Sequence, residues 1–155
     1  MLLHDLVNAS KKPSKSVPIL AQATAKGLSA IAVLRVSGSD LAASLLARLA
    51  WSLEPRRASL RTLRAPSGEA IDQVLAIFFP APHSFTGEDV LELHTHGSPA
   101  LIAWAVEALL DYGKAEGMRL AKPGEFSERA FLNADRKSTR LNSSHVSESR
   151  MPSSA

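Results

Sequence analysis

The sequence predicts an α+β domain in which helices cover a mixed or mostly antiparallel sheet. Short apolar runs and segments of helical periodicity follow one another in the order two strands, helix, three strands, helix. The 155 residues are 45% hydrophobic and 21% charged, which is typical of a globular chain with one core. No internal repeat of useful length is present.

The first two predicted strands are residues 18–24 and 30–38. The first, PILAQAT, is a short apolar run that Gly27 separates from the second. The second, AIAVLRVSG, is rich in β-branched residues and contains Arg35, whose two apolar neighbours point to the other face. We therefore expect Arg35 to lie on the sheet face opposite those neighbours.

Two segments have helical periodicity. In residues 39–51 leucines recur at helical spacing after Ser39, which we predict to be the N-cap. In residues 98–113 one face is apolar, and Ser98 as N-cap with Pro99 at the first helical position is a typical helix start. Each helix is expected to pack its apolar face on the sheet.

Three further strands are predicted between the helices. Residues 57–66 form a polar strand that we expect near an edge of the sheet. Residues 71–80 form a strongly apolar strand that ends at Pro80, and residues 88–97 form the third. After the second helix, residues 118–133 predict a short strand and then an irregular or helical segment.

The composition excludes several classes of protein. There is no cysteine, so disulfides and thiolate metal sites are ruled out and a reducing compartment fits. No apolar run approaches the ~20 residues that span a bilayer, so no membrane partner is expected. Residues 1–16 lack a signal-peptide core and are expected to be a disordered extension. Residues 135–155 hold four basic against two acidic residues, so this tail supplies much of the net charge of +3.

The stretch PHSFTGEDVLELHTHG, residues 82–97, carries the clearest candidate site. Strand alternation places Glu92, His94 and His96 on one face. Three such side chains could hold zinc, a Glu–His pair could act as acid and base, and a solvated polar strand face is the structural alternative. The HGSP junction also offers free N–H groups at a helix N-terminus. From these residues alone the interpretations stay open.

Four separated blocks give the sequence a specific resemblance: VLRVSG (33–38), AIDQVLAIFFP (70–80), PAPHSFTGEDVLELHTHGSP (80–99) and AKPGEFSERAFLN (121–133). In this order they resemble the N-terminal domain of the tRNA-modification GTPases called MnmE or TrmE, over residues 18–133. The resemblance implies a folate-binding α+β unit that forms a homodimer and is similar to half of the folate domain of glycine-cleavage aminomethyltransferase. We expect the short strand 18–24 to pair across the two-fold axis.

The resemblance also implies a cofactor and partners. The family binds a one-carbon tetrahydrofolate, such as 5-formyltetrahydrofolate. With a flavoprotein of the MnmG or GidA type, it builds a carboxymethylaminomethyl group on the wobble uridine of tRNA in the cytoplasm. Two folate contacts of the family correspond to Arg35 and Glu92. The resemblance implies that tRNA is an indirect partner. It implies no catalytic residue and no metal ligand in this chain. GTP, Mg²⁺ and K⁺ belong to a GTPase domain whose phosphate loop, G-x-x-x-x-G-K-[ST], does not occur in this sequence.

The sequence departs from the family in three places. Residues 23–30, ATAKGLSA, lack the paired prolines and most glycines of the family's first loop. Asp135 occupies the position of the family's third folate contact, a lysine, so the charge there is reversed. Residues 135–145 and 149–155 resemble translated sequencing adapter. We therefore expect the folate-binding dimerisation domain to cover residues 17–134 and residues 135–155 to be a disordered, non-native tail.

Three other functions remain possible at the level of sequence. An independent folate-dependent aminomethyltransferase would need the second half of its fold in the same chain. A small metal-dependent hydrolase would use Glu92, His94 and His96 as its ligands. An inert truncated fragment would have no activity of its own.

Overall fold

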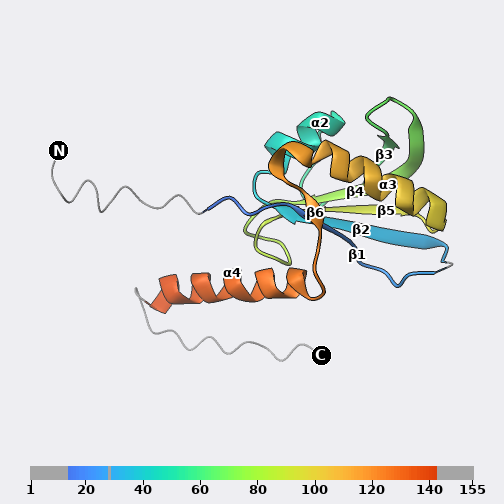
Figure 1. Ribbon diagram of the computed structural model, residues 1–155. Helices are drawn as coiled ribbons and strands as arrows, with labels where there is room; N and C mark the ends of the chain where they lie inside the picture. Colours follow the sequence, from blue (N-terminus) through green and yellow to red (C-terminus); the bar gives the residue numbers. More distant parts are fainter. Residues whose placement is uncertain (1–13, 28, 143–155) are drawn as a thin grey trace.

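A computed structural model of the chain describes residues 14–27 and 29–142. It has three layers: a six-stranded sheet, α3 with the short η1–α2 segment on one face, and α4 on the other (Figure 1). The elements, in chain order, are β1 (Ile19–Gln22), β2 (Ile31–Gly38), the π-helical turn η1 (Ala42–Leu46), α2 (Ala47–Leu49), β3 (Ser59–Arg64), β4 (Ala70–Phe79), β5 (Asp89–His96), α3 (Pro99–Tyr112), the 3₁₀ turn η2 (Lys114–Glu116), β6 (Arg119–Leu120) and α4 (Glu125–Asn142).

The strand order across the sheet is β3-β4-β5-β2-β1-β6. All neighbouring strands are antiparallel except β1 and β6, which are parallel. The predicted α+β class, the mixed sheet and the edge position of β3 are thereby confirmed. Within the chain, β6 pairs with Ile19 and Leu20 of β1, and the pairing of strand 18–24 with another chain stays a prediction.

One face of the sheet forms the core. Side chains that alternate along β2 and β5, such as Leu34 and Leu93, are fully buried there. They pack against Leu45 of η1 and Leu109 of α3. Burying each side chain of this size contributes about 1.5–3 kcal/mol, so this layer supplies most of the apolar stabilisation.

The predicted start of the first helix is wrong, whereas that of the second is confirmed. Ser39 does not cap η1, because its hydroxyl accepts a hydrogen bond from the Ser16 N–H and the chain turns through Asp40 at φ 54°. The Leu41 N–H donates instead to Oδ2 of Asp89, at 3.0 Å. Ser98 does precede Pro99 at the start of α3, although its side chain makes no capping hydrogen bond.

The C-terminal end of the described chain differs from expectation in the length of its helix. Residues 1–13 and 143–155 lie outside the described residues, and with them most of the expected extension and tail. Helix α4, however, continues past position 134 to Asn142, so residues 135–142 are helical where we expected disorder. No glycine or proline interrupts Glu125–Asn142, which lets the helix propagate. Within the described residues no helix has the length and apolarity to cross a bilayer.

Candidate ligand-binding site

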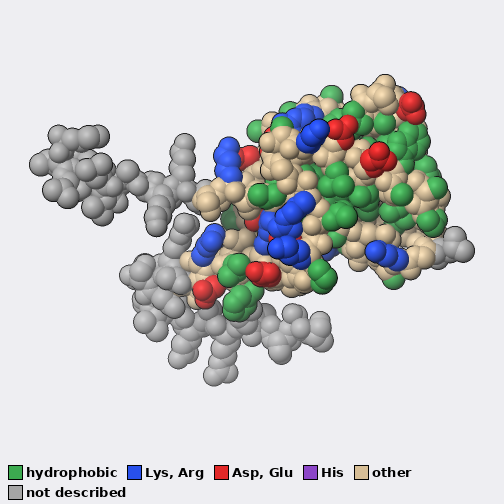
Figure 2. All heavy atoms as spheres, viewed as in Figure 1, with side chains coloured by type: hydrophobic (Ala, Val, Ile, Leu, Met, Phe, Trp, Pro, Cys, Tyr) green, Lys and Arg blue, Asp and Glu red, His purple; other side chains and the backbone are tan. Residues whose placement is uncertain are grey.

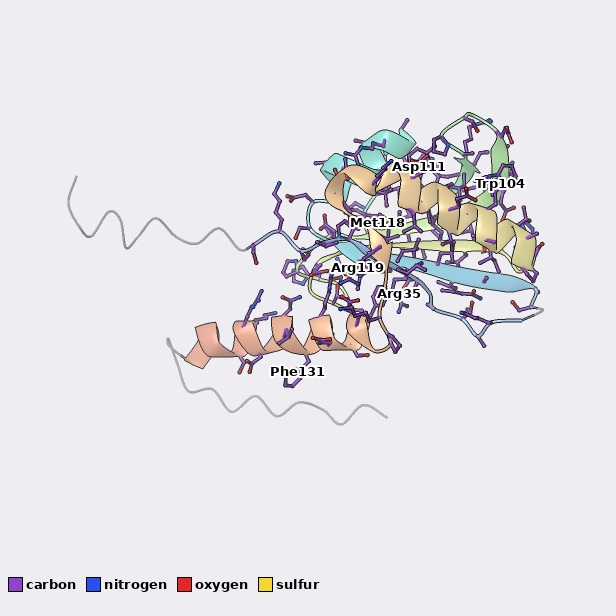
Figure 3. All side chains as sticks on the ribbon, viewed as in Figure 1. Arg35, Trp104, Asp111, Met118, Arg119 and Phe131 are labelled. Atoms are coloured by element: carbon purple, nitrogen blue, oxygen red, sulfur yellow. The ribbon has the colours of Figure 1, made fainter. Side chains whose placement is uncertain are left out.

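The second face of the sheet carries the two predicted ligand contacts as a direct pair. The register of β2 and β5 places Arg35 opposite Glu92, on the side of the sheet that faces α4 (Figure 3). Arg35 donates from Nε and Nη2 to Oε1 of Glu92, at 3.1 and 2.9 Å. The side chains are 28% and 19% exposed, so solvent and a ligand can reach a partly desolvated ion pair. The structure therefore brings together the two residues that the sequence separated by 57 positions.

Glu92 keeps one oxygen that Arg35 does not use. Its Oε2 lies 3.6 Å from Nε2 of His94, which is too long for a hydrogen bond. That His94 nitrogen is buried, and within the described residues it has no hydrogen-bond partner. A buried polar atom without a partner costs free energy. The site thus has a carboxylate oxygen that Arg35 does not use, beside a buried nitrogen without a hydrogen-bond partner.

The loop between β4 and β5 supplies an aromatic ring over this pair. Phe85 is largely exposed, and its ring centroid lies 5.7 Å from Cζ of Arg35. The loop is attached to β2, because the buried hydroxyls of Ser37 and Thr86 share a hydrogen bond of 2.7 Å. Gly87 has φ 81° and lies against Asn133 of α4, so a side chain at this position would be strained and crowded. The loop thereby holds an aromatic face beside a guanidinium and a carboxylate.

Glu88, just before β5, and Asp89, the first residue of the strand, have structural roles. Glu88 accepts hydrogen bonds from Ser37 at 2.8 Å and from Arg129 at 3.0 Å. Asp89 accepts from the Leu41 N–H through Oδ2 and from the Ala81 N–H through Oδ1, at 3.0 and 2.8 Å. These contacts hold the loop and the start of η1. The Glu92 side chain is more exposed than that of Glu88, 19% against 12%, so a ligand reaches it more easily.

Polar contacts, rather than a large apolar face, attach α4 to the sheet side. Arg129 donates to Glu88 and to the carbonyl of Val17, and Asn133 donates to the carbonyl of Thr86. At the start of α4, a bidentate hydrogen bond from Arg119 lowers the pKa of Glu125 to about 2. Sequence reasoning missed these anchors, because nothing in the spacing of Arg129 distinguishes it from a solvent-facing arginine of an amphipathic helix.

Asp135, the third predicted site position, lies elsewhere. It is exposed on α4, beyond the Arg129 and Asn133 contacts that reach the sheet. The structure thus pairs Arg35 with Glu92, and Asp135 occupies an exposed position of α4. Phe85 was missed as a site residue for a different reason, since only the register of the sheet shows that its loop returns over Arg35.

The predicted alternation along β5 is confirmed, but it does not produce a three-ligand metal site. Nδ1 of His96 lies 2.7 Å from Oδ1 of Asp72. The backbone N–H of His96 donates to Oδ2 of Asp72, at 2.9 Å. Glu92 is engaged by Arg35 instead. Among residues 14–27 and 29–142 no cluster of three or more His, Cys, Asp or Glu side chains could hold a metal ion. The metal-dependent hydrolase interpretation therefore lacks its ligand set in the described part of the chain.

The HGSP junction packs tightly against the first loop. The Gly97 N–H donates to the carbonyl of Ala30, at 3.1 Å. A Cβ at Gly97 would lie 1.7 Å from the Ser29 carbonyl oxygen. Only glycine fits this approach, so the loop that departs from the family pattern still closes against the strand–helix junction.

Comparison with known proteins agrees with this architecture. The family described as "GTP-binding protein TrmE N-terminus" matches residues 18–135. Proteins called tRNA modification GTPase MnmE are similar to this chain. The one from Acidovorax sp. (strain JS42) is 49% identical over 123 residues, 78% of this chain and 26% of its own length. The one from Bordetella avium (strain 197N) is 51% identical over 120 residues, which are 77% of this chain and 27% of the relative. The one from Ralstonia nicotianae is 47% identical over 126 residues, which are 81% of this chain and 27% of the relative.

Proposed function

Because the chain belongs to the family of the GTP-binding protein TrmE N-terminus, we propose that it binds a one-carbon tetrahydrofolate, such as 5-formyltetrahydrofolate, at Arg35 and Glu92. The observation that carries the proposal is the pair itself. It is a partly desolvated guanidinium and carboxylate on an open sheet face, with Glu92 Oε2 free of Arg35 and a buried His94 nitrogen beside it.

The chemistry of the pair suits the pterin end of a folate. A pterin presents a ring carbonyl next to a ring N–H and an amino group. A carboxylate oxygen accepts from such N–H groups, and the unused guanidinium N–H groups of Arg35 can donate to the carbonyl. Phe85 offers a ring face beside the guanidinium, against which a flat heterocycle can lie. A charge-assisted pair of this kind fixes the orientation of the ligand as well as holding it.

The role in the cell is proposed for a larger assembly. The chain spans about a quarter of the length of the relatives named above, and those relatives are tRNA modification GTPases by name. In this proposal the chain holds the folate, while a flavoprotein of the MnmG or GidA type completes the carboxymethylaminomethyl group on the wobble uridine in the cytoplasm. Contact with tRNA is then indirect.

The proposal includes self-association through the open sheet face. Ile31, Leu60 and Leu75 lie on that face and are exposed. The register places Leu75 between Leu60 and His94 in one row across the sheet. Exposed apolar side chains in such a row favour an apolar partner surface. A second copy of the chain would cover them and enclose the folate between two sheets.

Calorimetric titration with 5-formyltetrahydrofolate tests the site. Glu92→Gln should weaken binding about ten- to a hundredfold, because an acceptor is replaced by a donor facing the donors of the pterin. Glu107→Gln, an exposed change on α3 at the other face, is the matched control and should bind like the parent. Equal affinity of Glu92→Gln and the parent would contradict the site, and no binding by a folded parent would favour the inert fragment.

A further inference from the structure

A groove opens at the β1–β6 edge of the sheet, next to the proposed folate site. β6 pairs with only two residues of β1, and beyond Leu120 the chain turns away toward α4. The space that remains has a volume of about 560 Å³. Its wall and floor are apolar, formed by Leu20, Ala21, Val106, Leu120 and Phe126. Such a surface suits the flat or extended apolar part of a ligand.

Two lysines are among the residues that line this groove. Lys26 comes from the loop after β1 and Lys122 from the turn before α4, and both residues are exposed. Within the described residues neither has an ion-pair partner. Figure 2 shows basic side chains near β6, where Figure 3 labels Arg119, beside an apolar area of the surface. The groove therefore presents positive charge next to an apolar wall.

The carboxylate that lines the same groove does not cancel this charge. Glu125 is buried and accepts two hydrogen bonds of 2.7 Å from Arg119. It also accepts from the backbone N–H of Lys122, at 2.8 Å. Its negative charge is thus neutralised by a cation outside the lysine pair. The two lysines are left to attract an anion from solution.

The groove begins on β1, the strand next to the one that carries Arg35. Ala21, which lines the groove, is the register partner of Arg35 on the neighbouring strand. The strands β5, β2, β1 and β6 are consecutive neighbours, so roughly 14 Å separates Glu92 from the β6 edge at a spacing of about 4.8 Å per strand. A ligand bound to Glu92 at one end can reach the groove by crossing β2 and β1.

We propose that this groove is the subsite for the glutamate tail of the folate, with Lys26 and Lys122 binding the carboxylates of an oligo-γ-glutamate chain. The inference rests on the proposed function and adds the direction in which the ligand lies. The pterin meets Glu92, the aminobenzoyl ring follows the apolar wall, and each further glutamate adds a negative charge near the lysines. The site accordingly favours polyglutamylated folate over the monoglutamate.

Titrations with 5-formyltetrahydrofolate as the monoglutamate and as the pentaglutamate test the subsite. The parent chain should bind the pentaglutamate about three- to tenfold more tightly, as expected for two exposed ion pairs. Raising the salt to about 0.5 M should remove most of this preference. The double variant Lys26→Gln/Lys122→Gln should lose the preference and bind the two folates with equal affinity. Lys114→Gln, an exposed lysine of η2 outside the groove, should retain the full preference.

The outcomes separate this inference from the proposed function. Monoglutamate binding that depends on Glu92 but gains nothing from the tail would overturn the subsite and leave the folate site standing. A preference for the pentaglutamate that survives in the double variant would also overturn it, because the tail would then lie elsewhere. No binding of either folate by the folded parent would overturn both.

Discussion

The two faces of the sheet are built by the same strands but are finished in different ways. The face under α3 and η1 is sealed by fully buried leucines and valines. The other face carries Arg35, Glu92 and His94 among partly exposed apolar side chains, and α4 is attached to this side by polar contacts. Successive residues of a strand point to opposite faces of the sheet. Those on the sealed face stabilise the fold, and those on the other face are accessible to a ligand or partner.

The largest expected effect compares the same substitution on the two faces. Leu93→Ala removes a fully buried side chain from the sealed face and should lower the free energy of unfolding by about 2–5 kcal/mol. Leu75→Ala on the open face, where the side chain is 44% exposed, should cost less than about 1 kcal/mol. Urea unfolding at low protein concentration measures both. Similar losses at the two positions would mean that the open face is covered in solution.

A charge on the open face should break self-association. Leu75→Glu places a carboxylate where a second copy would bury it. We expect the dissociation constant of the dimer to rise at least about tenfold. Leu132→Glu is the matched control, because Leu132 is 45% exposed but lies on α4. Sedimentation equilibrium over a range of concentrations compares the two variants with the parent. A monomeric parent, or equal effects of the two variants, would argue against the open face as the dimer interface.

Acid should weaken the attachment of α4 before it affects the sealed face. Arg119 holds the pKa of Glu125 at about 2, below its ordinary value of 4.5. A carboxyl with a lowered pKa in the folded state contributes stability above about pH 4.5 and loses it as the pH falls toward 2. Glu125→Gln should therefore cost about 1–2 kcal/mol at pH 6, after allowance for solvent screening, and about a quarter of that at pH 2.5.

Unfolding of the parent and of Glu125→Gln at several pH values measures this difference. Glu128→Gln, an exposed change one turn further along α4, should leave the pH profile unchanged. Hydrogen exchange should show α4 losing protection in acid while α3 keeps it. A difference between parent and Glu125→Gln that does not shrink below pH 4 would rule out the ion pair as its cause.

Periodicity was sufficient to predict the strands, because each strand of the sheet has one apolar and one mixed face. It also placed Arg35 and Glu92 on accessible positions, and the resemblance assigned them to a common site. Periodicity could not show that the two side chains bind each other, because that depends on the β2–β5 register, which only the folded sheet defines.

The features that the sequence did not predict are long-range polar contacts. Asp89 replaces Ser39 as the group that satisfies the start of η1, across 48 positions of the chain. Arg129 reaches Glu88 across 41 positions. Local propensity rules describe caps and pairs within a few residues, so a cap supplied by a neighbouring strand lies beyond them. The predicted end of order at position 134 failed for a related reason, since a helix anchored at Arg129 and Asn133 can continue for further turns.

The smallest expected effect concerns the reversed charge at position 135. Asp135→Lys restores the cation that the family pattern has there and should strengthen binding of 5-formyltetrahydrofolate about two- to fivefold, because an exposed charge acts on the ligand through screened solvent. Glu128→Lys is the matched control, since it makes the same change of charge on another exposed residue of α4. Calorimetric titration of both variants at two salt concentrations separates the possibilities. A gain confined to Asp135→Lys shows that the charge at this position acts on the bound ligand, and equal gains in both variants indicate an effect of net charge alone. An unchanged affinity in Asp135→Lys would mean that the polar anchors of α4 hold position 135 away from the ligand, and that Arg35 and Glu92 bind the folate without it.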